Sequence, residues 1–185
     1  MTLSETYEND IKKVLITEEQ LENRLSELAS QIDSDYKGKD LLVIGILKGA
    51  IFTITKLASK IKKNVEIDFI TLSSYGSDTK SSGDIKLIMD LDENVKDRNI
   101  LVVEDIIDTG LTMKWLIEYL QSKGAASVEV CTLLRKKEAH IYDVSAKYVG
   151  FEVPEVFVVG FGLDYNQYYR NIPYIGVLKE EIYEK

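Results

Sequence analysis

The stretch Asn99–Met113, NILVVEDIIDTGLTM, joins an apolar run to a group of acidic residues and then to small hydroxylated ones. Glu104 and Asp105 follow the apolar run directly, and Asp108 comes after two isoleucines. An ionised carboxylate is costly to bury without a partner, so these side chains should face a ligand or solvent. A short apolar run that ends in such residues is typical of a buried parallel strand with a site at its C-terminal end.

A helix is expected immediately after the acidic residues. Its apolar face would be formed by Met113, Leu116, Ile117 and Leu120. A helix that begins near Thr112 has unpaired backbone N–H groups and a partial positive charge in its first turn. Thr109, Gly110 and Thr112 add hydroxyls and a close backbone approach, which predicts a pocket for a phosphate monoester. The preceding carboxylates would repel that phosphate and suit sugar hydroxyls, a magnesium ion or a group that needs a base. A phosphate beside a diol indicates a ribose 5-phosphate.

Outward from this stretch, strand and helix patterns alternate along the chain. Thr17–Gln20 fits a capping box, and helical apolar spacing follows it and recurs after Ala50. Strands are expected over 41–47, 65–74, 84–91 and 127–134, with Val65, Ile67 and Phe69 on one face of the second. A polar, glycine-bearing loop separates the second and third of these strands. The order predicts an α/β fold with right-handed crossovers and with extra strands from the tail segments EVFVVGF and YIGVL.

Composition bounds the class of protein. The 185 residues, 45% of them hydrophobic, can bury one substantial core. The formal charge of −8 argues against a broad basic surface for nucleic acid and against adhesion to an anionic membrane. Cys131 is the only cysteine and His140 the only histidine, which excludes an internal disulfide and an HExxH zinc motif. The sequence shows no secretory or membrane-spanning segment, so we expect a cytoplasmic protein.

Other local motifs fit less well. The chain has no GxxxxGK[ST], and GFGLDY at Gly160 lacks the third glycine of a dinucleotide fingerprint. DLDEN at Asp90 begins like a calcium loop, but Val95 and Leu101 stand where glycine and glutamate are required. DTG also occurs in aspartic proteases, where it does not follow two further acids and lead into an amphipathic helix. A plain helix-capping turn remains the alternative for Thr-Gly-x-Thr alone.

The segment VVEDIIDTGLT resembles the phosphoribosyl-diphosphate-binding signature of type I phosphoribosyltransferases. Other segments resemble the hypoxanthine-guanine phosphoribosyltransferases and stand in family order: GILKGA, SSYGS with SGDIK, LLRKK, and the block 148–178. The resemblance covers about residues 41 to 178. It implies a central, mostly parallel sheet flanked by helices, with a small hood lobe formed by the terminal segments. A single domain over 1–185 is expected, with its core at about 17–140 and its hood at about 1–16 and 145–185.

The resemblance also implies a reaction, in which 5-phosphoribosyl-1-diphosphate and a 6-oxopurine give the nucleoside monophosphate and pyrophosphate. The 5'-phosphate and ribose would be bound by Glu104, Asp105, Thr109, Gly110, Leu111 and Thr112. Leu111 stands in the variable middle of the phosphate loop, where backbone groups dominate binding. Asp108 would act as the base at the purine N7. Its alternative role is an ordinary helix cap, and one residue can serve both purposes.

The purine-side residues rest on the resemblance. Lys136 would donate to the purine O6 and thereby favour an oxo over an amino group, whereas Arg135 and Lys137 would be surface charges. From the residues alone, these three cations cannot be told apart. Phe157 would stack on the purine, although periodicity alone places it in the core. Val158 would offer backbone groups to the N1/C2 edge.

The pyrophosphate side is implied in the same way. Mg²⁺ would be held by Glu104, Asp105 and Asp164, with the last of these on the pyrophosphate. Arg170, Lys48 and Gly49 would bind pyrophosphate oxygens, and in relatives the peptide before the lysine can be cis. Ser74 and Tyr75 would lie on a loop that closes over the reacting centre and excludes water.

Rival functions are a non-catalytic sensor of phosphoribosyl diphosphate and a pyrimidine or adenine transferase. A sensor should lack the purine-side set of Lys136, Phe157 and Asp164, and all three are present. The LLRKK and VFVVGFGLDY segments argue against the other bases. The sequence leaves open the preference among hypoxanthine, guanine and xanthine. Expected partners are these small molecules and, by resemblance, other copies of the chain in a homodimer or homotetramer.

Overall fold

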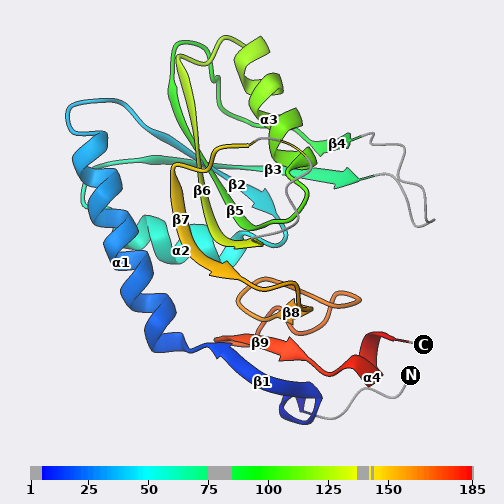
Figure 1. The fold of residues 1–185 in the computed structure, drawn as a ribbon. Coiled ribbons are helices and arrows are strands. Elements are labelled where there is room, and N and C mark those ends of the chain that lie inside the picture. Colours follow the sequence, from blue (N-terminus) through cyan, green and yellow to red (C-terminus); the bar gives the residue numbers. More distant parts are fainter. Residues whose placement is uncertain (1–5, 75–84, 137–141, 143, 185) are drawn as a thin grey trace.

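The computed structural model describes residues 6–74, 85–136, 142 and 144–184. The described residues form two sheets, and the larger one separates two layers of helices (Figure 1). The six-stranded sheet has the order β4-β3-β2-β5-β6-β7 and comprises β2 (Leu42–Leu47), β3 (Glu66–Ser74), β4 (Ile85–Met89), β5 (Asn99–Ile107), β6 (Ser127–Lys136) and β7 (Tyr148–Val153). All neighbours in it are parallel except β3 and β4, which pair antiparallel on either side of the expected loop. The predicted mostly parallel α/β sheet is confirmed.

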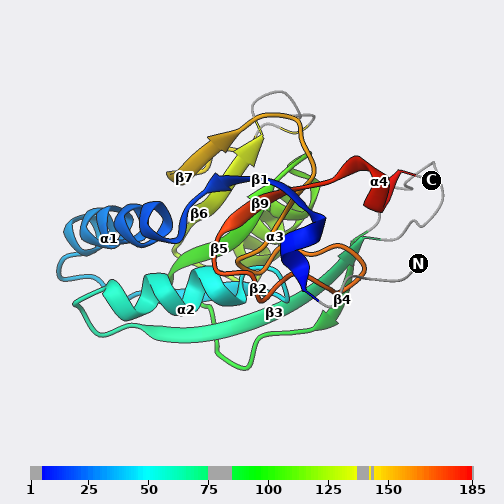
Figure 2. The same ribbon diagram turned by 90° about the horizontal axis from the view of Figure 1, so that it is seen from below.

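Helices cover both faces of this sheet. α1 (Glu18–Asp35) and α2 (Ile51–Lys60) lie on one face, and α3 (Leu111–Ser122) lies on the other (Figures 1 and 2). Two short helices, η1 (Tyr7–Asp10) and α4 (Glu180–Tyr183), flank the smaller sheet. Among the described residues, no helix combines the length and the apolar character needed to cross a membrane.

The first long helix begins where the sequence predicted. The Thr17 hydroxyl accepts a hydrogen bond from the Gln20 amide, and the Gln20 side chain accepts one from the Thr17 amide. This reciprocal pair satisfies two amides that the helix itself leaves unbonded. Every fourth or third residue along the helix is then apolar and fully buried, namely Leu21, Leu25, Leu28 and Ile32. α1 therefore packs firmly against the sheet.

Two apolar cores lie on the two faces of the larger sheet. One joins α1 and α2 to side chains such as Val43 and Leu101, and the other joins α3 to side chains such as Ile44 and Val102. Adjacent residues of one strand thus enter different cores, which explains the uninterrupted apolar runs in β2 and β5. Both strands are anchored from two sides, so their C-terminal ends are fixed in position.

The smaller sheet, β1-β9-β8, forms a second lobe beyond the ends of the larger sheet (Figure 1). It comprises β1 (Ile11–Ile16), β8 (Val158–Val159) and β9 (Ile175–Leu178), with both neighbouring pairs antiparallel. A lobe built from the two terminal segments was expected. Its second part was expected from about residue 145, whereas residues 148–153 form β7 at the edge of the six-stranded sheet. β7 pairs with β6 there, so the second lobe starts after Val153.

Candidate active site

Expected site residues follow the C-terminal ends of four strands of the larger sheet. Lys48 follows β2, Asp108 follows β5, Lys136 ends β6, and Ser74 ends β3. The pairing of β5 with β6 sets Ile107 against Arg135, so the next residues of the two strands, Asp108 and Lys136, also meet. Their side chains lie 3.4 Å apart, from the Lys136 Nζ to the Asp108 Oδ2. The sheet register alone thus brings two chemically complementary groups together at the edge where α/β proteins bind ligands.

The loop between β5 and α3 forms a small cavity of about 100 Å³, lined by Glu104, Ile106, Ile107, Asp108, Thr109, Gly110, Thr112 and Met113. Gly110 is the N-cap of α3 in a left-handed conformation, with φ of 84°, and has no side chain to cap the helix, while the Leu111 amide donates a long hydrogen bond of 3.4 Å to the Thr109 hydroxyl. The helix starts at Leu111, one residue before the expected position. The first-turn amides after Leu111 have no partner within the helix and can donate to an external acceptor, and the helix dipole favours an anion. The cavity therefore has the character of a phosphate site.

Two carboxyl groups meet beside this cavity. The Glu104 Oε1 accepts a hydrogen bond from the Asp105 amide, and Asp105 is 9% exposed. Desolvation, together with the Asp105 carboxylate, raises the pKa of Glu104 well above its ordinary value. A cation or a pair of sugar hydroxyls would relieve this repulsion, because either one stabilises the ionised form. Glu104 and Asp105 thus suit a divalent metal or a ribose diol.

Asp105 also touches the loop that follows β2. A Cβ atom built on Gly49 would lie 1.9 Å from the Asp105 Oδ2, and one built on Gly162 would lie 2.0 Å from the Gly49 carbonyl oxygen. Gly162 has a φ of 106°, a conformation that other residues rarely adopt. The peptide between Leu47 and Lys48 is cis. The loop after β2 is therefore packed between the Asp105 carboxylate and the backbone of the second lobe. Neither Gly49 nor Gly162 has space for a side chain.

Polar side chains of the second lobe extend this contact. The Lys48 Nζ donates to the Gln167 Oε1 at 3.1 Å. Arg170 donates to the Gly162 carbonyl at 2.6 Å and pairs with Asp164 at 2.7 Å. Among the described residues, the Arg170 Nε is one of the buried polar atoms that have no hydrogen-bond partner. Gln167 links Lys48 to Arg170, which in turn pairs with Asp164, and sequence reasoning missed Gln167.

Asp164 is not arranged as a ready metal ligand. Its Oδ1 pairs with Arg170, and its Oδ2 accepts the Gln167 amide at 2.8 Å. Within the described ranges, no three acidic, histidine or cysteine side chains form a metal cluster, so Asp164 does not join Glu104 and Asp105. Mg²⁺ binds proteins through one or two carboxylates plus substrate oxygens, which is compatible with two separate positions.

Phe157 lies in an aromatic cluster of the second lobe. Its ring stacks on Tyr183 of α4, with 4.8 Å between the centroids, and meets Tyr165 edge-on at 5.6 Å. The side chain is only partly buried, so it is neither a plain core residue nor fully available. Val158 follows in β8, which is an edge strand, and one row of its backbone groups is not paired with β9. The Phe157–Val158 segment can therefore offer both a ring and backbone groups.

Of the two residues expected on the closing loop, only Ser74 lies within the described part of the chain. Ser74 is the last residue of β3 and pairs with Ile85 of β4, whereas Tyr75 lies outside the described residues. Glu155, whose carboxylate binds Lys136, was also missed by sequence reasoning. Neither it nor Gln167 carries a local signal, because their contacts join segments far apart in the chain.

Comparison with known proteins places these features in a family context. Residues 15–166 match the family model of the phosphoribosyl transferase domain. A hypoxanthine-guanine phosphoribosyltransferase of Streptococcus agalactiae is 48% identical over 96% of this chain and 99% of that protein. One from Lactococcus lactis is 49% identical over 99% of this chain and 100% of that protein. The crystal structure of a hypoxanthine phosphoribosyltransferase from Staphylococcus aureus superposes with a TM-score of 0.94 at 43% identity, covering 100% of both chains.

Proposed function

The chain belongs to the phosphoribosyltransferase family, and from this premise we propose that it is a purine salvage enzyme. It transfers the 5-phosphoribosyl group of 5-phosphoribosyl-1-diphosphate to N9 of hypoxanthine or guanine, releasing pyrophosphate and giving IMP or GMP. Near-full-length relatives carry this activity in their names. The observation that carries the proposal is the pairing of Asp108 with Lys136 beside the open N-terminus of α3.

The phosphoribosyl half of the reaction takes place at the end of β5. The first-turn amides of α3, with Thr109 and Thr112, bind the 5'-phosphate, and Gly110 and Leu111 contribute backbone. Glu104 and Asp105 face the ribose hydroxyls. As the bond from C1' to pyrophosphate breaks, positive charge develops on the sugar, and these carboxylates stabilise it.

The purine half lies between β5, β6 and the second lobe. Asp108 accepts the N7 proton as N9 attacks C1', and Lys136 donates to O6. An ammonium favours the oxo group of hypoxanthine or guanine over the amino group of adenine, because it has protons but no acceptor. Phe157 stacks on the base, and the free edge of β8 at Val158 meets its N1/C2 side.

The pyrophosphate half uses the contact between the two lobes. Lys48, Gly49 and Arg170 bind pyrophosphate oxygens, and Glu104, Asp105 and Asp164 are the carboxylates for Mg²⁺. Asp164, which pairs with Arg170, would be the carboxylate nearest the pyrophosphate, and the planar fork of Arg170 suits phosphate oxygens. The chemistry that Mg²⁺ supplies when bound is neutralisation of charge on the departing pyrophosphate. Ser74, the last residue of β3, is kept in the proposal as a residue next to the reacting atoms, while its expected neighbour Tyr75 lies outside the described residues.

The proposal includes a single domain that self-associates as a homodimer or homotetramer in the cytoplasm. Three apolar side chains, Ile51 and Phe52 at the start of α2 and Ile67 near the start of β3, are 40%, 38% and 46% exposed. Such a group is suited to contact with a second copy. Cys131, whose pKa burial raises to about 12, is an inert thiol that suits a reducing compartment.

A steady-state assay with phosphoribosyl diphosphate, Mg²⁺ and one base at a time tests the proposal. We expect nucleotide formation with hypoxanthine and guanine and none with adenine, uracil or orotate. Phosphoribosyl diphosphate that binds in calorimetry without any base being converted would indicate a sensor instead. Turnover of adenine in preference to hypoxanthine would refute the role of Lys136.

A further inference from the structure

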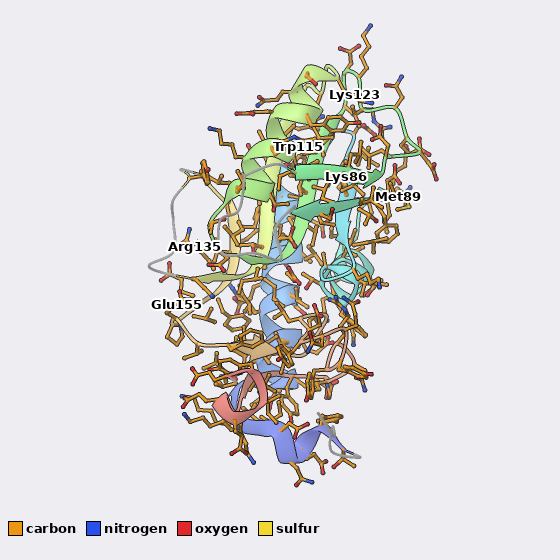
Figure 3. The ribbon with its side chains drawn as sticks, turned by 90° about the vertical axis from the view of Figure 1, so that its right-hand side faces the viewer. Lys86, Met89, Trp115, Lys123, Arg135 and Glu155 are labelled. Atoms are coloured by element: carbon orange, nitrogen blue, oxygen red, sulfur yellow. The ribbon has the colours of Figure 1, made fainter. Side chains whose placement is uncertain are left out.

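Glu155 lies where the chain passes from the six-stranded sheet to the second lobe. β7 ends at Val153, and the Val156 amide then donates to the Pro154 carbonyl at 2.9 Å, which forms a tight turn around Glu155. Figure 3 shows Glu155 on the same edge of the molecule as Arg135, at the end of β6. The same short segment leads directly into Phe157 and β8. Glu155 is thus placed between the base-facing end of β6 and the base-facing strand of the second lobe.

The Glu155 carboxylate competes with Asp108 for a single cation. The Lys136 Nζ lies 2.7 Å from the Glu155 Oε1 but 3.4 Å from the Asp108 Oδ2. The first distance is that of a charge-assisted hydrogen bond, and the second is at the long limit for any hydrogen bond. Only 15% of the Lys136 side chain is exposed, so the ammonium cannot simply move into solvent. In the free protein, Glu155 therefore holds Lys136 more strongly than Asp108 does.

This arrangement keeps Lys136 charged. Burial would lower the pKa of Lys136, but the hydrogen bond to Glu155 and the charges of Asp108 and Glu155 outweigh burial and raise it above the ordinary lysine value. An ammonium has three N–H donors. Two of these N–H groups are directed at the carboxylates of Glu155 and Asp108, and the third remains for an acceptor on a ligand.

We propose that Glu155 is a positioning residue for oxopurine recognition, which holds the Lys136 ammonium away from Asp108. Lys136 can then donate to the purine O6 while Asp108 stays open to N7. The inference rests on the proposed function and adds a residue to it. Without the Glu155 charge, Lys136 would close onto Asp108, and both groups would be lost to the purine at once.

Two ligands separate this role from general support of the site. IMP presents O6 to Lys136, whereas ribose 5-phosphate contains only the sugar and phosphate. In calorimetric titrations, Glu155→Gln is expected to weaken IMP binding by about tenfold, the loss of one moderate interaction, and to leave ribose 5-phosphate binding unchanged. Glu155→Asp keeps the charge on a shorter side chain and should recover part of the loss. In turnover, the KM for hypoxanthine should rise while the KM for phosphoribosyl diphosphate stays constant.

Glu152→Gln is the matched control. Glu152 of β7 pairs with Arg135 of β6 at 2.6 Å, three residues before Glu155, so this variant removes a carboxylate next to the neighbouring cation. It should bind both ligands like the wild type, and a loss of IMP affinity only in this control would assign the role to Arg135 and overturn the proposal. Equal IMP affinity of wild type and Glu155→Gln, or parallel losses for both ligands, would also overturn it. A wild type that bound ribose 5-phosphate but not IMP would refute the purine half of the proposed function itself.

Discussion

At the scale of single residues, the position of Asp108 explains its chemistry. The residue follows a strand that is anchored in two cores, and its side chain is 52% exposed toward the site. An exposed carboxylate held on rigid backbone can reach a bound base without a rearrangement of the fold. In the proposed site, Lys136 lies opposite it and would limit where the base can lie.

We predict that Asp108→Asn lowers kcat by about 10²–10⁴-fold, the usual contribution of a general base. Asparagine keeps the size and polarity of the side chain but cannot take the N7 proton, so the Kd of phosphoribosyl diphosphate should not change. Rapid-quench kinetics and calorimetry measure the two quantities. Asp92→Asn, at an exposed position between β4 and β5, is the control and should behave like the wild type. Unchanged turnover in Asp108→Asn would remove Asp108 from the role of base.

Gly49 is a second residue whose identity the geometry requires. We predict that Gly49→Ala raises the KM for phosphoribosyl diphosphate at least about tenfold and lowers stability, because its Cβ would overlap the Asp105 carboxylate at 1.9 Å. Gly38→Ala is the control, since a Cβ there meets nothing within 4 Å but has to tolerate a φ of 73°. That variant should lose about 1 kcal/mol of stability without a change in KM. Equal KM values in the two variants would contradict the packing argument.

At the scale of elements, α1 is held to the larger sheet by polar contacts at its C-terminal end. The Tyr148 hydroxyl of β7 donates to the Asp35 Oδ2 at 2.7 Å, and the Lys147 Nζ lies 3.1 Å from the same oxygen. The hydrogen bonds from Tyr148 and Lys147 lower the pKa of Asp35 below its ordinary value of 3.8. These contacts join the end of α1 to the start of the edge strand.

We predict that Asp35→Asn lowers the urea midpoint at pH 7 and that the difference from the wild type shrinks as the pH falls below about 4. A carboxylate with a lowered pKa in the folded state stabilises the protein above its unfolded pKa and loses that effect on protonation. Urea titrations between pH 7 and pH 3 measure the trend. Tyr148→Phe, which removes only the hydroxyl, should reproduce part of it. A difference that stayed constant with pH would show that the charge of Asp35 is not involved.

Local patterns predicted the elements that carry their own signals. The capping box at Thr17 was recognisable because it bonds the free amides of the helix start. The continuous apolar runs of β2 and β5 were recognisable because both faces of these strands are buried. β1 and β7 were not predicted as strands. β1 contains two adjacent lysines, and β7 contains Gly150, whose missing side chain permits a close approach to the Leu133 carbonyl of β6. β1 and β7 each form by pairing with another strand, β9 and β6, and a local sequence pattern does not reveal these pairings.

The candidate site also has one part that a local pattern predicted and another part that it did not. The phosphate loop at Gly110 follows from one continuous stretch, and the roles of Lys136, Phe157 and Arg170 came from the resemblance alone. Contacts such as Lys48 with Gln167 join loops whose meeting depends on how the lobes pack. Ile67, expected to share a face with Val65 and Phe69, is 46% exposed, whereas those two pack against the core beneath α1 and α2.

At the scale of the whole molecule, the exposed apolar side chain of Ile67 on β3 bears on assembly. We predict that Ile67→Glu shifts the protein toward the monomer, because a charge would have to be buried in the contact between copies. Size-exclusion chromatography with light scattering over a dilution series measures the mass. Val14→Glu on β1, at a position that is 48% exposed, is the control and should assemble like the wild type. An unchanged mass for Ile67→Glu would place the contact on another face.

The pairing of β1 with β9 has a consequence for how the protein matures during synthesis. Ile11 and Leu178 are partners in this pairing, although the whole larger sheet lies between them in the chain. A ribosome completes that sheet when residue 153 has emerged, while β1 must wait for residues 175–178 before it gains a neighbour. The proposed phosphate loop therefore leaves the ribosome before Arg170 and β8 do. We expect a nascent chain at that stage to lack the residues proposed for pyrophosphate and purine.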